Sequence, residues 1–402
     1  MPSSVAQASA RDRLLADLAE ELSALGDAGL LRRLTSLDAV KGPIVRIDGR
    51  ALVNWCSNDY LGLSLHPALA EAAARAAAVW GVGARASRLL AGTTRWHTQL
   101  EESLAAWFGT EAAVVYPSGY LANLGTLGAL LSSRDAVFMD RSAHASLFDA
   151  VRSTRATLRV FRHNDASHLS ILLSRWTGGR RRFIVTEGVF SMDGDCPPLA
   201  ELVELAHAHG ATVYVDDAHG AFALGERGRG TPEAAGVPHD QLIYMGTLGK
   251  AIGCQGGFVV GPRTLVEFLQ NRARTFLYTT ALAVPIAAAA VEALRLLGQE
   301  PNRRERLREL AERLHSRLAR LQVITATSPS HIVPIIIGET RRAVDVSAAL
   351  WEEGIWAPSV RPPTVPKGTA RVRLGVTALH TDAQIDALAD ALHRLLPRIR
   401  NA

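Results

Sequence analysis

Two apolar runs of the sequence end in residues that can act together on one ligand. The run ATVYV leads directly into Asp216 and His219, and the run LIYMG leads into Thr247 and Lys250. Parallel-sheet enzymes build their sites at the carboxyl ends of strands, so an acid and a lysine at two such ends can face the same ligand. The pattern predicts a site that combines a carboxylate, an imidazole and an amine.

Pyridoxal phosphate requires such an acid and such an amine. The amine holds the aldehyde of the cofactor as an imine, and the carboxylate keeps the pyridine nitrogen protonated, so that the ring accepts electrons from a carbanion. Lys250 is one of three lysines among 44 Lys and Arg residues, and only an amine forms a Schiff base. The other two, Lys41 and Lys367, lie in turns rich in Gly and Pro. The sequence therefore predicts pyridoxal phosphate at Lys250 and Asp216.

A phosphate site should accompany this pair. Ser118, Gly119 and Tyr120 follow an apolar run that ends at Tyr116 and begin a helix, so backbone amides and the helix dipole there suit a phosphate. Thr247 can add a hydroxyl. A Ser-Gly at a helix start is more often only a cap, and the prediction depends on the combination of signals.

The elements that must position these residues alternate between strand and helix. Strands that alternate with helices predict an α/β fold with a mostly parallel sheet covered on both faces. The apolar runs that would form the strands span residues 112–116, 136–139, 158–161, 183–186, 212–215, 242–245 and 257–260.

The rhythm of the sequence changes after residue 321. Apolar runs at 331–337 and 370–376 flank a helix near 343–353, and Thr381 can cap a last helix, which predicts a smaller α/β unit. We expect residues 1–55 to form an N-terminal helix and arm, residues 56–290 a large cofactor-binding domain and residues 291–402 a small C-terminal α/β domain.

The composition limits the class of protein. Hydrophobic residues make up 48% and charged residues 21% of the 402 residues, which is typical of a globular chain of two domains. The most apolar stretch, residues 281–291, contains Pro285 and is closed by Glu292, so it predicts a buried helix and not a membrane span. The first residues lack the pattern of a secretory signal, and a cytoplasmic protein is expected.

The cysteines and the charge exclude further classes. Cys56, Cys196 and Cys254 are odd in number and far apart, which argues against a disulfide framework and against a metal site. The net charge of +5 comes from scattered basic residues, so a solvated basic surface is expected and no nucleic-acid partner. The alternative is attraction of an acidic substrate, such as a CoA thioester or a carrier protein.

Four segments carry a resemblance to a known family. The chain resembles the α-oxoamine synthases of the fold-type I (aspartate-aminotransferase-like) pyridoxal-phosphate enzymes through SNDYLGL from Ser57, TEGVFSMDGD from Thr186, VDDAHG from Val215 and GTLGKAIG from Gly246. The resemblance covers nearly the whole chain. It implies a large domain with a seven-stranded, mostly parallel sheet and a smaller C-terminal α/β domain.

The resemblance also implies roles for site residues. Lys250 would be the Schiff-base lysine, Asp216 would contact the pyridine nitrogen and His219 would lie near the phenolic oxygen. His144 would stack on the ring and Glu187 would support the site, which completes the expected catalytic set. The other cofactor-binding positions would be Ser118, Gly119, Tyr120 and Thr247 at the phosphate, Ser191 near the phenolic oxygen, and Thr280 at the phosphate of a partner subunit.

On the substrate side, Arg361 of RPPTVP resembles the arginine that pairs with the amino-acid carboxylate in the family, consistent with the bidentate geometry of arginine. Thr364, Asn58 and Arg32 match neighbouring substrate positions. From the residues alone, a solvated loop arginine before two prolines is the favoured interpretation of Arg361.

Enzymes of this family are acyltransferases that join an amino acid to an acyl thioester with loss of carbon dioxide. The freed amine of Lys250 would remove the α-proton, and the resulting carbanion would attack the thioester carbonyl. The segments VDDAHG and RPPTVP, the latter followed by GTARVRL, are most similar to the branch that uses L-alanine and a pimeloyl thioester, on CoA or on a carrier protein, in biotin biosynthesis. Ala218 favours this branch.

Two departures from the family pattern leave alternatives open. The loop GVGARASRLLAGT has Ala84, Arg85 and Ala86 where Gly and Ser are expected, and Phe222 stands where the biotin enzymes usually have glycine. Phe222 would either narrow the pocket or pack behind it. The alternatives are an acyltransferase that uses glycine or serine with another thioester, an aminotransferase of the same fold, and a catalytically silent homologue.

The family also predicts an assembly. Fold-type I enzymes complete each site across a twofold axis, so a homodimer is expected. The leucines between Arg13 and Leu25 lie at helical spacing, and this N-terminal helix must pack on something else, such as a neighbouring subunit.

Overall fold

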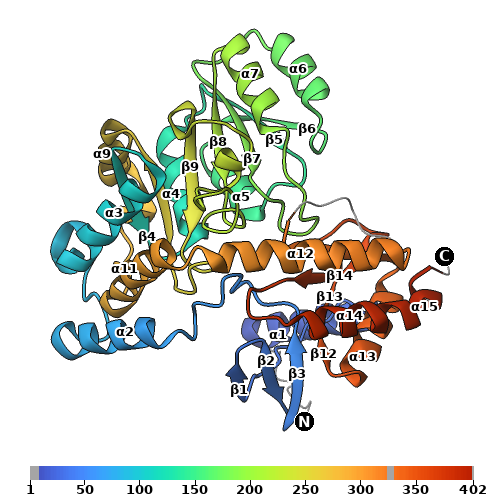
Figure 1. Cartoon of the computed structure of the whole chain (residues 1–402). Helices are drawn as coiled ribbons and strands as arrows, with labels where there is room; N and C mark the ends of the chain where they lie inside the picture. Colours follow the sequence, from blue (N-terminus) through green and yellow to red (C-terminus); the bar gives the residue numbers. More distant parts are fainter. Residues whose placement is uncertain (1–8, 324–329, 401–402) are drawn as a thin grey trace, which may run out of the picture.

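The computed structural model describes residues 9–323 and 330–400, and a seven-stranded sheet is its largest element (Figure 1). The strand order is β4-β10-β9-β8-β7-β5-β6. Strand β10 is antiparallel to both of its neighbours, and every other pair in the sheet is parallel. The strands are β4 (Ala112–Tyr116), β5 (Ala136–Asp140), β6 (Thr157–Phe161), β7 (Arg182–Glu187), β8 (Ala211–Asp216), β9 (Leu242–Thr247) and β10 (Gly257–Gly261). Each of the seven predicted runs is one of these strands, which confirms the mostly parallel sheet.

Helices cover both faces of this sheet. Successive side chains of each strand point to opposite faces, so both faces carry apolar residues that must be buried. In β4, Ala113 and Val115 belong to one buried core, whereas Val114 and Tyr116 belong to the core of the opposite face. The first face is covered by α3 (Arg95–Phe108), α6 (Ala166–Ser174), α7 (Leu199–His209) and α11 (Val284–Gln299), with α2 (Pro67–Trp80) packed on α11. The second face is covered by α4 (Gly119–Leu130), α5 (Ala145–Ser153), α9 (Arg263–Arg272) and α10 (Arg274–Leu277). Shorter helical turns span Arg88–Gly92, His239–Gln241 and α8 (Thr231–Ala234).

The C-terminal part forms a second, smaller sheet with helices. Its antiparallel strands are β11 (Ile332–Gly338), β14 (Ala370–Gly375) and β13 (Ser359–Val360), and its helices are α12 (Asn302–Arg320), α13 (Thr340–Glu352), α14 (Asp382–Arg394) and α15 (Leu396–Arg400). Thr381 caps α14, since its Oγ1 accepts a hydrogen bond from the Gln384 amide at 3.2 Å. The predicted smaller α/β unit is confirmed, and the helix predicted from Thr381 is α14, although the short α15 and not α14 is the last helix.

The N-terminal segment joins the C-terminal one. Strands β1 (Ala39–Lys41), β2 (Ile44–Ile47) and β3 (Arg50–Asn54) form an antiparallel sheet, and β12 (Ile355–Trp356) adds to β3 in parallel. Helix α1 (Ala10–Asp27) contains the predicted leucines, and none of its residues is buried. In the part of the chain that the structure describes, no helix is long and apolar enough to cross a membrane.

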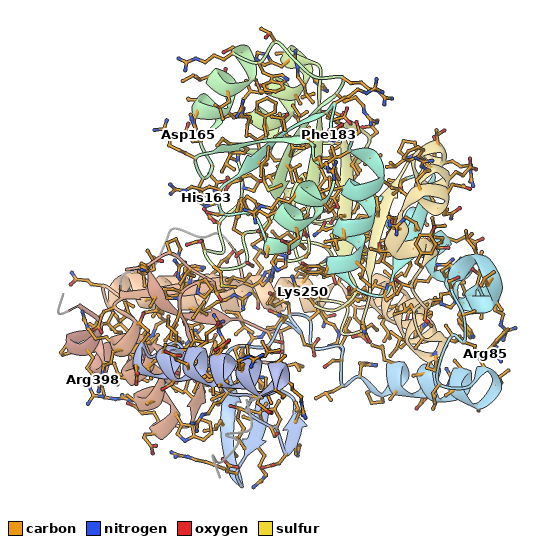
Figure 2. All side chains as sticks on the ribbon, turned by 180° about the vertical axis from the view of Figure 1, so that it is seen from behind. Arg85, His163, Asp165, Phe183, Lys250 and Arg398 are labelled. Carbon is orange, nitrogen blue, oxygen red and sulfur yellow. The ribbon has the colours of Figure 1, made fainter. Side chains whose placement is uncertain are left out.

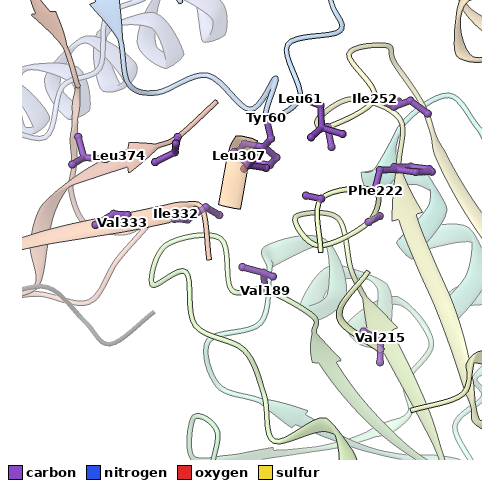
Figure 3. Close-up of a cluster of buried hydrophobic side chains, with 14 of the residues drawn as sticks. Tyr60, Leu61, Val189, Val215, Phe222, Ile252, Leu307, Ile332, Val333 and Leu374 are labelled. Atoms are coloured by element: carbon purple, nitrogen blue, oxygen red, sulfur yellow. The ribbon is translucent and has the colours of Figure 1, made fainter. Parts of the chain in front are cut away.

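One core runs through both units. It includes Val189, which follows β7, Val215 of β8, Tyr60 of the connecting segment, and Leu307 and Ile332 of the C-terminal unit, and Figure 3 shows these side chains as parts of one cluster. The two units are therefore packed on each other without a solvent gap at this point. The domain boundaries at residues 55 and 290 stay a prediction.

Both departures from the family pattern have left-handed backbones. Arg85 and Phe222 each have φ of 66°, a conformation that favours glycine. Phe222 is fully buried, and its ring lies 5.4 Å from that of Phe108 and 5.7 Å from that of Phe258. Neither Arg85 nor Phe222 is among the residues that line the cavity at Lys250, and Figure 2 shows Arg85 at the edge of the molecule, away from Lys250. Phe222 thus packs behind the site.

Candidate active site

A cavity of about 800 Å³ lies at the carboxyl ends of the parallel strands, with Lys250 on its wall. Figure 2 places Lys250 where the large sheet meets the C-terminal unit. Side chains from widely separated parts of the chain converge there. The lining residues include Arg32, Asn58, Arg141, His144, Phe148, Ser191, His219, Lys250, Thr364 and Arg373. Six of the predicted site residues besides Lys250 are therefore brought together: Arg32, Asn58, His144, Ser191, His219 and Thr364.

Lys250 lies three residues after β9, and its side chain is partly buried. Nζ lies 2.8 Å from Nε2 of His219, and Nδ1 of His219 lies 2.6 Å from the hydroxyl of Tyr60. Burial lowers the pKa of Lys250 to about 8, although the negative charge of Asp216 acts in the opposite direction. An amine with this pKa is partly neutral near physiological pH, so it can act as a nucleophile and a base.

Asp216 ends β8 and is held in one orientation. Its Oδ2 accepts a hydrogen bond of 2.6 Å from Asn123 Nδ2, and its Oδ1 accepts one of 3.0 Å from the Ala218 amide. Glu187 ends β7 and pairs with Asp216 in the strand register. Burial, and then the charge of Asp216, raise the pKa of Glu187 well above its usual range. Oε1 of Glu187 is buried without a partner among the described residues.

The predicted phosphate site is formed by the start of α4 and the end of β9. Ser118 caps α4, since its Oγ accepts a hydrogen bond from the Leu121 amide at 3.2 Å. A Cβ on Gly119 would lie 3.5 Å from Thr247 Oγ1, so Gly119 and Thr247 are neighbours. Thr247 donates to the carbonyl of Gly256 at 2.7 Å. The structure brings the helix N-terminus and this hydroxyl to one place, as the sequence predicts.

His144 lies beside Tyr120, in the first turn of α4. The ring of Tyr120 is T-shaped to that of His144 with centroids 6.5 Å apart, and its hydroxyl bonds to Asp149. His144 caps α5 through Nδ1, which accepts from the Ser146 amide. Burial lowers the pKa of His144, so the ring is neutral at physiological pH.

The arginines of the substrate side are divided between two cavities. Arg373, in β14, lines the cavity at Lys250 and donates through Nε to the carbonyl of Ser191 at 2.5 Å. Arg361 lines a neighbouring cavity and donates to the carbonyl of Gly29 at 2.6 Å. Thr364 accepts a hydrogen bond of 3.2 Å from Arg32. The role of Arg361 stays a prediction, and Arg373 is a second candidate.

Thr280 lies outside this cavity. It is exposed and forms an isolated β-bridge with Ser87. Its expected contact with a partner subunit stays a prediction.

Three residues of the site were not predicted. Asn123 and Tyr60 are fully buried behind the cavity, and Arg373 is 8% exposed. Tyr60 and Arg373 lie within SNDYLGL and GTARVRL, so their motifs pointed to the region and not to the residue. Two arginines within one short strand, Arg371 and Arg373, are a signal that could have identified it, because buried charges need a specific partner.

The donor set fits pyridoxal phosphate. A partly buried amine of lowered pKa, Lys250, suits the aldehyde, and the oriented carboxylate of Asp216 suits a protonated pyridine nitrogen. The start of α4 at Gly119, next to the Thr247 hydroxyl, suits the phosphate through its backbone amides and the helix dipole. Within the residues described, no group of His, Cys, Asp and Glu side chains could hold a metal ion.

Comparison with known proteins agrees with this geometry. The family model "Aminotransferase class I and II" matches residues 50–392. The 8-amino-7-oxononanoate synthase of Anaeromyxobacter dehalogenans is 48% identical over 377 residues, which cover 94% of each chain, and that of Chromobacterium violaceum is 46% identical over 94% of this chain and 98% of its own. The structure of a serine palmitoyltransferase from S. paucimobilis with bound PLP is similar, with a TM-score of 0.91, 32% identity and coverage of 96% and 98% of the two chains.

Fold and site thus define a fold-type I enzyme. The chain belongs to the class I and II aminotransferase family and, within it, to the α-oxoamine synthases.

Proposed function

We propose that this protein catalyses the reaction of 8-amino-7-oxononanoate synthases, the decarboxylative condensation of L-alanine with a pimeloyl thioester, with pyridoxal 5'-phosphate as cofactor. The observation that carries the proposal is the partly buried Lys250 amine in a cavity that also presents His144, His219 and Arg373. The identity of 48% to proteins of that name over 94% of the chain supports the choice within the family.

The chain's own residues would hold the cofactor at its two ends. The start of α4 at Ser118 and Gly119, with Thr247, would bind the phosphate, and Asp216 would pair with the ring nitrogen. His144 would cover one face of the ring. When bound, pyridoxal phosphate withdraws electrons from the α-carbon of the amino acid.

Lys250 would then act as the base. Its lowered pKa, about 8, leaves a neutral fraction of the amine that can remove the proton from the α-carbon of alanine. A carbon–carbon bond forms between that α-carbon and the thioester carbonyl carbon, and the carbon–sulfur bond breaks to release the thiol. The carboxylate that came from alanine leaves as carbon dioxide, and a proton returns to the α-carbon.

Arg373 and Asn58 would orient the amino acid. The guanidinium of Arg373 is fixed by the carbonyl of Ser191 and lies 3.3 Å from the Tyr60 hydroxyl, so it can pair with the alanine carboxylate without further ordering. Arg32, Arg361 and Thr364 would contact the substrates from the opposite side.

The active form would be a cytoplasmic homodimer. Leu14, Leu18 and Leu22 of α1 are each between 44% and 56% exposed, and a second subunit would cover such a face. Thr280, exposed at the surface, would contact the partner's cofactor phosphate. Sedimentation of the active enzyme would test this, and active monomers would contradict it.

The experiment that tests the function is thiol release from pimeloyl-CoA by the cofactor-loaded protein with L-alanine, glycine or L-serine. The expected result is turnover with L-alanine and an α-amino ketone product identified by mass spectrometry. Turnover with glycine or serine instead would retain the family and reject the substrate. Transfer of the amino group to a keto acid without thiol release would identify an aminotransferase.

A further inference from the structure

Asn123 connects two residues of the proposed cofactor site, Asp216 directly and His144 through Ser146. It lies on α4 and is 1% exposed. Its Nδ2 donates to Asp216 Oδ2 at 2.6 Å and to Ser146 Oγ at 2.8 Å, and its Oδ1 accepts from the Tyr214 hydroxyl at 2.7 Å. The reversed amide would turn an oxygen toward the carboxylate of Asp216, which only accepts. The network therefore allows a single orientation of this side chain.

The same amide determines the direction of the next hydrogen bond. Because Ser146 Oγ accepts from Asn123, its own proton is free to go to His144 Nδ1, which lies 2.8 Å away. The Ser146 backbone amide donates to the same nitrogen at 3.2 Å, as the cap of α5. Two donors converge on Nδ1, so this nitrogen carries the lone pair and the ring proton belongs on Nε2.

We propose that Asn123 and Ser146 are positioning residues that hold His144 as the Nε2–H tautomer, while the same Asn123 amide orients Asp216. His144 lines the cavity beside Lys250. It then presents a hydrogen-bond donor to the substrate oxygens and cannot serve as the proton acceptor, a role left to Lys250. The identity of those oxygens, on alanine or on the thioester, rests on the proposed function.

The position of the ring proton decides whether His144 attracts or repels a substrate oxygen. A ring with its proton on Nδ1 would direct a lone pair toward a carboxylate or a developing oxyanion, which repels it. A ring with its proton on Nε2 stabilises the same oxygen, and a preoriented donor needs no rearrangement during the reaction. The tautomer is thus part of the catalytic arrangement.

Ser146→Ala tests the link to His144 and leaves the bond between Asn123 and Asp216 in place. Its matched control is Ser153→Ala, on the same helix, where the hydroxyl donates only to the Ala150 carbonyl. The readout is ¹⁵N NMR of histidine-labelled cofactor-bound protein, with the His144 signals assigned by their loss in His144→Gln. In the parent protein and in the control, we expect an unprotonated Nδ1 and a protonated Nε2. In Ser146→Ala only the longer bond from the backbone amide still favours an unprotonated Nδ1, so we expect a mixture of tautomers and a kcat about fivefold to tenfold lower, with little change in KM.

Asn123→Leu removes both arms of the network. We expect the mixed tautomer of Ser146→Ala together with cofactor release about tenfold faster, measured by transfer of pyridoxal phosphate to an apo-enzyme acceptor. Ser146→Ala should not change cofactor release. If Asn123→Leu does not fold, the comparison of Ser146→Ala with Ser153→Ala still tests the inference.

A protonated Nδ1 in the parent protein, or the same tautomer in Ser146→Ala as in Ser153→Ala, would overturn the inference. The NMR readout requires no turnover. A protein inactive with alanine but with the expected tautomers would reject the proposed function and leave this inference standing.

Discussion

Lys250 and His219 meet at the wall of the cavity, with Nζ 2.8 Å from Nε2. Burial, and then the charge of Lys250, hold the pKa of His219 well below its usual range, so the imidazole stays neutral beside the amine. A neutral ring shares a hydrogen bond with the amine and adds no second positive charge. Burial therefore remains the main cause of the lowered pKa of Lys250. The next two predictions concern this amine.

Lys250→Ala should lower thiol release at least about a thousandfold, because it removes both the nucleophile and the base. Borohydride reduction of the cofactor-bound protein followed by peptide mass spectrometry should label Lys250 in the parent protein. The matched control is Lys41→Ala, an exposed lysine in β1. Label on another lysine, or full activity of Lys250→Ala, would reject the assignment.

The covalent uptake of pyridoxal phosphate by the cofactor-free protein should depend on pH. Only the neutral amine attacks an aldehyde, and burial lowers the pKa of Lys250 from 10.5 to about 8. The uptake rate should therefore rise with pH, with a midpoint near 8, when absorbance is followed in stopped flow. A midpoint near the ordinary value of 10.5 would show that the amine is solvated.

Phe222→Gly should destabilise the protein although it relieves a left-handed backbone. Loss of a buried phenyl ring costs about 3–5 kcal/mol, whereas relief of positive φ returns about 1–2 kcal/mol. The expected net loss is about 1–4 kcal/mol, visible as a lower urea midpoint.

Arg85→Gly is the matched variant, since Arg85 has the same φ of 66° and an exposed side chain. In Arg85→Gly only the relief of positive φ applies, because no buried side chain is lost. We expect a gain in stability of about 1 kcal/mol. Equal shifts in the two variants would show that the aromatic contacts of Phe222 contribute nothing.

Arg373→Ala should raise the KM for L-alanine about tenfold to a hundredfold, the range for a charged hydrogen bond to a carboxylate. Steady-state kinetics of Arg361→Ala under the same conditions separates the two candidates. A larger effect for Arg361 would mean that this side chain leaves the Gly29 carbonyl when substrate binds. If the KM were unchanged in Arg373→Ala, the role of Arg373 would be only to hold the Ser191 carbonyl in place.

His163 should make stability depend on pH through its two carboxylate partners. Burial acts against its charge, but Asp140 and Asp195, each 2.9 Å away, raise the pKa of His163 to about 10. A raised folded-state pKa contributes stability that is complete below the unfolded value of 6.5 and is lost as pH rises through about 10.

Thermal unfolding of His163→Gln checks this. The variant should lose most relative to the parent protein at pH 6, and the difference should shrink toward pH 10. His207→Gln, an exposed histidine on α7, is the control. A difference that does not vary with pH would indicate that His163 contributes through packing only.

Much of the architecture was determined by the sequence itself. The period of the apolar runs predicted all seven strands of the large sheet, because local burial on both faces leaves a continuous apolar signature. Asp216 and Lys250 were predicted together because β8 and β9 are parallel neighbours, and parallel strands end at one edge of the sheet. The prediction of a phosphate site at Gly119 followed from the same rule with a helix start added.

Only the tertiary structure decided the partners of those residues. The hydrogen bond between Asn123 and Asp216 joins residues 93 positions apart in the sequence, and the one between Arg373 and Tyr60 joins residues 313 positions apart. A local sequence pattern cannot predict such pairs. The pairing of β12 with β3 was likewise absent from the prediction, since two residues are too few for a pattern. Periodicity reports which face of an element is buried. It does not report which buried polar group lies opposite, because that depends on how separate elements pack in space.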